Sequence, residues 1–76
     1  MAIPVVINKN IRHGKPVIKG TRVTVEEILG GLAGGMTYEE IRKEYGIGKE
    51  GILAAIGYAT AWFRGEEVVP LVKTRA

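Results

Sequence analysis

The chain has 76 residues, a formal net charge of +3 and no cysteine. A chain of this length forms one small domain with a marginal core, and the lack of cysteine excludes disulfides and thiolate metal sites. We expect no signal peptide, because residues 1–4 lack a charged start and a long apolar run, and no window approaches the roughly 20 apolar residues of a membrane span. The sequence therefore predicts a cytoplasmic protein without a membrane segment.

Charge is distributed unevenly along the chain. The first 25 residues carry cations and the single histidine, His13, but no acid, whereas residues 26–67 carry all eight glutamates. The cations of the first segment are Lys9, Arg12, Lys15, Lys19 and Arg22. A basic face is typical of proteins that bind polyanions, and the alternative is a solvated surface whose counter-charges lie on the helices. His13 has no cysteine, aspartate or second histidine beside it, so we expect no metal site.

Short extended segments precede the helices. Residues 3–11 carry β-branched side chains at their centre and predict a strand. His13–Gly14 predicts a turn, residues 16–19 a second strand, and residues 22–24 a third extended piece. The glycines at positions 14 and 20 bracket Val17–Ile18, and this apolar pair indicates an ordered segment rather than a linker.

Three helices are predicted between residues 24 and 65. Thr24 with Glu27, and Thr37 with Glu40, fit the capping box, in which a hydroxyl at the N-cap pairs with a glutamate three residues later. The predicted ends are the glycines Gly34–Gly35, Gly46 and Gly65. Each helix start also has an apolar pair of the hydrophobic-staple type. The pairs are Val23 with Ile28, Met36 with Ile41, and Ile47 with Ile52.

The third helix, which starts at Gly48 or Lys49 and runs to about Arg64, is apolar on nearly every side. A helix of this kind is buried on more than one side, but a three-helix domain of this size is expected to bury only one. We therefore predict a homodimer through this helix; the alternative is a loosely packed surface in which alanine serves helix propensity. The predicted interface residues are Ala54, Gly57, Tyr58, Ala61 and Trp62.

The last segment, residues 66–76, predicts an extended tail with an apolar centre. Pro70 excludes a central strand position, so the tail is an edge strand, a peptide that docks on a partner protein, or a disordered end. The residues predicted to contact a partner are Val68, Val69 and Leu71. The predicted organisation is one domain over residues 1–76, with a basic β arm (1–23), a three-helix body (24–65) and the tail.

Residues 38–56 have the plan of a helix-turn-helix, with a short helix, a turn at Gly46–Gly48 and a longer helix. In DNA-binding proteins of this type the start of the second helix faces the base edges. Lys49, Glu50 and Gly51 offer one cation and no Asn, Gln or Arg, so the predicted DNA contacts are mainly to phosphates. The predicted nucleic-acid-binding residues are Lys9, Arg12, Lys15, Lys19, Arg22 and Lys49.

The run Gly-Lys-Pro-Val-Ile-Lys-Gly-Thr-Arg-Val-Thr-Val at residues 14–25, with Ile28-Leu29, Thr-Tyr-Glu-Glu-Ile at 37–41 and residues 52–59, closely resembles the small prokaryotic domain-of-unknown-function family 433. The resemblance covers nearly the whole chain, and the first run is highly specific. It implies a mainly α fold: a three-helix, homeodomain-like helix-turn-helix bundle preceded by a short N-terminal β element. It also implies the antitoxin of a type II toxin–antitoxin pair, often beside a nuclease-like toxin of the PIN type. Glycines at positions 48, 51 and 57 depart from the family pattern and are expected to weaken the third helix as a rigid reader.

Two functional hypotheses follow from the sequence. In the first, the protein is an antitoxin-like helix-turn-helix dimer whose basic arm contacts double-stranded DNA and whose tail neutralises a toxin from the neighbouring gene. In the second, it is a protein-interaction module without nucleic acid, and Lys15, Lys19 and Arg22 are structural or partner-facing. We expect no enzyme activity and no cofactor, because helix N-termini or solvent exposure explain the paired glutamates.

Overall fold

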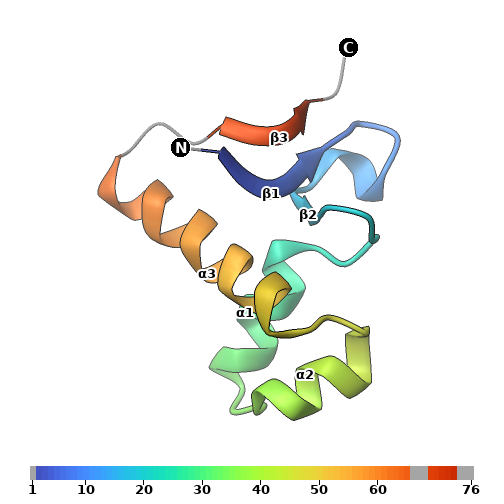
Figure 1. Cartoon of the computed structure of the whole chain (residues 1–76), viewed down its shortest axis with the longest axis vertical. Coiled ribbons are helices and arrows are strands. Elements are labelled where there is room, and N and C mark those ends of the chain that lie inside the picture. The colour runs from blue at the N-terminus through green and yellow to red at the C-terminus, as the bar shows by residue number, and fades with distance from the viewer. Residues whose placement is uncertain (1, 66–68, 74–76) are drawn as a thin grey trace.

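A computed structural model of the chain describes residues 2–65 and 69–73 (Figure 1). The elements in order are β1 (Ala2–Ile7), a 3₁₀ turn (Arg12–Gly14), β2 (Val17–Ile18), α1 (Val25–Ala33), α2 (Tyr38–Tyr45), α3 (Lys49–Arg64) and β3 (Val69–Lys73). The predicted mainly α fold, with three helices after a short β element, is confirmed. None of these three helices combines the length and hydropathy that crossing a bilayer requires.

The first strand is shorter than predicted, because the chain turns at Asn8. The Asn8 side chain accepts a hydrogen bond from the N–H of Asn10 at 2.8 Å, and the Asn8 carbonyl accepts one from the N–H of Ile11, also at 2.8 Å. Asparagine commonly makes such local bonds, which compete with the ladder of a strand. The strand therefore ends at Ile7 rather than at residue 11.

The three strands form one sheet in the order β2-β1-β3. β1 is antiparallel to β2, with Val5 opposite Ile18 and Val6 opposite Val17, and it is parallel to β3. The tail is thus an edge strand, which is one of the three predicted alternatives, and an edge position tolerates Pro70. The other residues of the predicted tail, 66–68 and 74–76, lie outside the described part of the chain.

Both predicted capping boxes are present. Thr24 Oγ1 accepts the N–H of Glu27 at 2.9 Å, while the Glu27 carboxylate accepts the N–H of Thr24, also at 2.9 Å. Thr37 and Glu40 make the same pair of bonds at the start of α2, at 3.1 and 2.8 Å. At its other end α2 stops at Gly46, whose φ of 71° is the left-handed conformation typical of a helix C-cap. Local sequence signals therefore define these boundaries.

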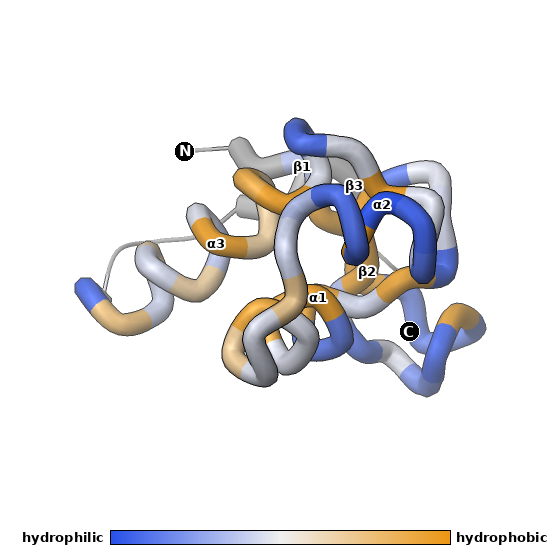
Figure 2. The backbone as a smooth tube through the Cα atoms, turned by 90° about the horizontal axis from the view of Figure 1, so that it is seen from below, coloured by the Kyte–Doolittle hydropathy of each residue, from blue (hydrophilic) through white to orange (hydrophobic). Residues whose placement is uncertain are grey.

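The core lies along α3, which packs against α1 on one side and against β1 on another (Figure 1). Its most deeply buried apolar side chains come from every layer: Val5, Val17, Ile28, Ile41, Ile52 and Ala55. Figure 2 shows that hydrophobic segments concentrate in α1, α3 and the strands, whereas most of α2 is hydrophilic. The N-terminal segment is thus part of the core rather than a separate arm.

This packing corrects the prediction that a single protomer buries only one side of the third helix. Ala54, Tyr58 and Ala61 are each less than a tenth exposed within one protomer. Ala54 and Ala61 are seven residues apart and share a helix face. Tyr58, Ala59 and Trp62 line the side of α3 that faces α1, and α3 also packs against β1. The sheet, which the sequence argument left out, supplies the second covering layer.

The glycines of the third helix do not simply weaken it. Gly48 is the N-cap, in an extended conformation. A Cβ on Gly51 would lie 2.5 Å from Ile47 Cγ2 and 3.5 Å from Ile18 Cγ2, so glycine lets the start of α3 pack closely on the turn and on β2. Among the described residues, a Cβ on Gly57 meets nothing within 4 Å, and nothing in this part of the chain explains glycine there.

These two glycines give a matched test of helix packing. Gly57→Ala is expected to raise the free energy of unfolding by up to about 1 kcal/mol, through helix propensity alone. Gly51→Ala gains the same propensity but forces Ile47 to move, and overpacking costs about 1–3 kcal/mol, so stability is expected to stay level or fall. Urea unfolding of both variants measures the difference. Equal stabilisation by both substitutions would contradict the close contact at Gly51.

Candidate nucleic-acid and protein interfaces

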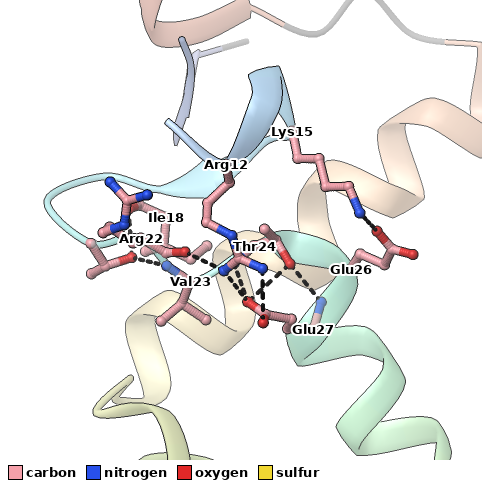
Figure 3. Close-up of polar contacts among 9 residues, drawn as sticks. Arg12, Lys15, Ile18, Arg22, Val23, Thr24, Glu26 and Glu27 are labelled. Carbon is pink, nitrogen blue, oxygen red and sulfur yellow. Dashed lines mark hydrogen bonds and ion pairs between the residues drawn. The ribbon is translucent and has the colours of Figure 1, made fainter. Parts of the chain in front are cut away.

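The segment between β1 and α1 folds into a tight loop that positions the start of α1 (Figure 3). Thr21 Oγ1 donates to the carbonyl of Ile18 at 2.8 Å and accepts the N–H of Val23 at 3.0 Å. The N–H of Ile18 donates to the carbonyl of Val23 at 2.9 Å, and Gly20 takes a φ of 82° at the tip of the loop. These bonds place Thr24 at the N-cap of α1.

Arg12 connects this loop to the first turn of α1. Its Nη1 donates to the carbonyl of Arg22 at 2.9 Å, and its two terminal nitrogens reach the Glu27 carboxylate at 3.1 and 3.3 Å (Figure 3). The same carboxylate also accepts the N–H of Thr24. The Thr24 N–H and then the Arg12 guanidinium hold the pKa of Glu27 below its ordinary value. Arg12 therefore acts as a structural clamp, since a bidentate arginine–carboxylate pair is directional as well as strong.

A second predicted DNA contact, Lys15, is also engaged by α1. Its Nζ lies 3.1 Å from a carboxylate oxygen of Glu26, and both side chains are more than half exposed. A pair this exposed adds little stability, but it places a negative charge beside the lysine. The acid-free basic segment of the sequence is thus partly neutralised in the folded protein, because α1 brings its first two glutamates against it.

The remaining predicted cations, Lys9, Lys19, Arg22 and Lys49, are exposed. The Arg22 guanidinium points away from Glu27 (Figure 3). Thr21 lines a shallow hollow of about 370 Å³ together with Lys49 at the start of α3, and it lines a neighbouring hollow with Arg22. We call this surface the basic end of α3, defined by Lys19, Arg22 and Lys49. Two segments far apart in sequence meet there.

A second candidate surface is an apolar groove between α1 and the C-terminal half of α3, with a volume of about 630 Å³. The residues that line this groove include Leu29, Ala33, Ala59, Trp62 and Phe63. Phe63 is 92% exposed and Trp62 is 67% exposed. Phe63 was not among the interface residues predicted from the sequence, because periodicity showed only that the third helix is apolar on nearly every side.

The residues predicted for the dimer interface and for the partner-binding tail do not form one exposed surface in the structure. Of the five positions predicted for a dimer interface, only Trp62 is exposed; Gly57 is half-buried and the other three are in the protomer core. Val69 and Leu71 belong to β3, and Val68 lies outside the described residues. Nowhere in residues 2–65 and 69–73 do three potential metal-ligating side chains come together.

Residues 5–59 match a protein family described as "Protein of unknown function (DUF433)". The chain belongs to the DUF433 family. The DUF433 match runs from within β1 to within α3, so it includes the capping network and the basic end of α3 but neither Trp62 nor Phe63. Comparisons with curated proteins and with solved structures gave no match.

Proposed function

We propose that this DUF433 protein is an antitoxin-like helix-turn-helix protein of a type II toxin–antitoxin pair, which binds double-stranded DNA as a dimer in the cytoplasm and neutralises a toxin from the neighbouring gene. The observation that carries the DNA half is the basic end of α3. Lys19 and Arg22 come from the loop before α1, and Lys49 begins the second helix of the helix-turn-helix. These three exposed cations, two on the loop and one at the start of that helix, suit phosphate contacts.

The backbone at the start of α3 also favours an anion. Gly48 has no side chain to cap the helix, and no side-chain cap bond is present there. The first N–H groups of a helix and its dipole attract negative charge, so a phosphate oxygen can take the place of the missing cap. Glu50 opposes this attraction and offers no base-specific donor. The proposal is therefore phosphate binding with weak base reading.

The proposal is tested by binding of the protein to DNA from upstream of its own gene across a salt series. Each phosphate contact contributes a slope of about −0.9 in log K against log [salt]. Three contacts per protomer predict a slope of about −5 for a dimer, and Lys49→Ala is expected to reduce it by about 2.

Lys15→Ala is the matched control for this experiment. Lys15 is a cation of the same segment, but Glu26 already neutralises it, so its loss is expected to leave the salt slope nearly unchanged. An absence of binding at low salt would contradict the DNA half of the proposal. Equal losses for Lys15→Ala and Lys49→Ala would contradict the assignment of the contacts to the basic end of α3.

Three observations favour a second candidate, a protein-interaction module without nucleic acid. Arg12 and Lys15 already hold protein carboxylates, and the groove between α1 and α3 is apolar. β3 is also an edge strand, to which a partner could add a strand. Co-purification with the product of the neighbouring gene, without affinity for DNA at low salt, would favour this candidate over the first.

A further inference from the structure

The geometry points to a second copy of this chain as the occupant of the groove between α1 and α3, with Trp62 and Phe63 of each copy covered by the groove of the other. This inference rests on the self-association that the proposed function includes, and it moves the interface away from Ala54 and Ala61. Those residues are already buried within one protomer.

The groove and the side chains that would fill it lie on the same surface. Trp62 and Phe63 line the groove. They belong to the C-terminal turns of α3, which extend past the other helices (Figures 1 and 2). A two-fold symmetric interface requires that one patch be complementary to itself. A patch that carries both a hollow and projecting aromatic side chains meets this requirement, because each copy can fill the hollow of the other.

The exposed aromatic side chains supply a large part of the area that a dimer needs. Aromatic side chains bury roughly 150–250 Å² each, so Trp62 and Phe63 at their present exposure offer roughly 300 Å² per copy. Two copies give roughly 600 Å², about half of the ~1,200 Å² at the lower end of specific interfaces. Leu29, Ala33 and Ala59 on the groove walls add to this area.

Charge does not oppose this contact locally. Glu26 is the one charged residue among those that line the groove, and its carboxylate is paired with Lys15 at 3.1 Å. The described lining of the groove therefore brings no unpaired like charges together when two copies meet there. The apolar centre and paired rim resemble the core and rim of known protein interfaces.

The arrangement also leaves the DNA surface free. Lys49 and Phe63 are near opposite ends of α3, about 21 Å apart at 1.5 Å per residue. If the two Phe63 ends meet at the symmetry axis, the two basic ends lie up to about 40 Å apart, and tilting the helices shortens this distance. Successive half-sites on DNA lie about 34 Å apart, which falls within this range.

Sedimentation velocity of the full chain across a micromolar dilution series, followed in parallel by the emission of Trp62, tests the inference. Trp62 is the single tryptophan of the chain, so its emission reports on the groove. We expect a monomer–dimer equilibrium in which the emission shifts to the blue as the dimer forms. Phe63→Glu is expected to raise the dimer dissociation constant by about 30-fold or more, as for a central aromatic contact.

Leu53→Glu is the matched control, because Leu53 is an exposed apolar residue of α3, at 48% exposure, outside the groove. A monomer at every concentration, a dimer that leaves the emission of Trp62 unchanged, or equal weakening by the two substitutions would each overturn the inference. No DNA is present in these measurements, so a failure of DNA binding leaves their result intact. Binding of DNA by a monomer would contradict the dimer, but it would be consistent with DNA binding by the basic end of α3.

Discussion

Replacing Ile28 with alanine is expected to lower the free energy of unfolding by about 2–5 kcal/mol, the range for buried isoleucine in well-packed cores. Ile28 is fully buried in the core cluster that also contains Val5 and Ile52. A domain of 76 residues has roughly 4–11 kcal/mol of stability in total. The substitution therefore removes a large share of it, and urea unfolding followed by circular dichroism measures the loss.

Two further variants keep this prediction testable if Ile28→Ala does not fold. Ile28→Val removes a single methylene and is expected to cost about 0.5–1.5 kcal/mol. Leu53→Ala deletes a similar side chain from a half-exposed position and is expected to cost less than about 1 kcal/mol. A loss for Ile28→Ala no larger than that for Leu53→Ala would contradict the position of Ile28 in the core.

Replacing Glu27 with alanine is expected to cost about 2 kcal/mol, the upper part of the range for loss of a helix cap. The carboxylate accepts hydrogen bonds from the backbone N–H and the hydroxyl of Thr24, and from both terminal nitrogens of Arg12. Its loss removes half of a capping box and leaves Arg12, which also donates to the carbonyl of Arg22, without this carboxylate. Thermal unfolding of the variant against the unmodified chain measures the effect.

Glu40 provides the matched control for Glu27. It closes the same capping box at the start of α2, but it is exposed, and no arginine contact is among the bonds that the structure gives for its carboxylate. Glu40→Ala is expected to cost about 0.5–1 kcal/mol, the usual value of an exposed cap. Equal costs at the two positions would indicate that the Arg12 clamp contributes nothing measurable.

The contribution of Glu27 also depends on pH. Its pKa in the folded protein is lowered below the ordinary value of 4.5, first by the Thr24 N–H and then by Arg12. The stabilisation is therefore complete above that value and is lost as the pH falls from it through the lowered pKa. The difference in unfolding free energy between the unmodified chain and Glu27→Gln is expected to shrink over this acidic window. A constant difference would contradict the lowered pKa.

The basic segment has two separate roles in this structure. Arg12 and Lys15 hold the loop against α1, whereas Lys19 and Arg22 are exposed on the loop whose Thr21 lines a hollow with Lys49. The main role of the segment is therefore to position the start of α1. Its exposed cations Lys19 and Arg22 are available to bind a polyanion. In the proposed function, DNA contacts and self-association then use opposite ends of α3.

Local signals in the sequence determined the helices. The capping residues Thr24 and Thr37, with their glutamates, and the glycine at 46 act within a few residues of one another, so their geometry follows from the backbone alone. The same reasoning located the short turn between α2 and α3 and placed Lys49 at the start of α3. The residue pattern of positions 14–25 indicated the family, and the match over residues 5–59 shows it.

Contacts between distant segments were decided only by the tertiary structure. The pairing of Arg12 with Glu27 joins residues fifteen positions apart, and β1 lies between β2 and a strand from the end of the chain. Periodicity identified α3 as apolar on nearly every side, but it could not say that Ala54 and Ala61 are buried within the protomer or that Phe63 remains exposed. Which apolar side is covered depends on where the other elements pack, and that is a property of the whole fold rather than of any one helix.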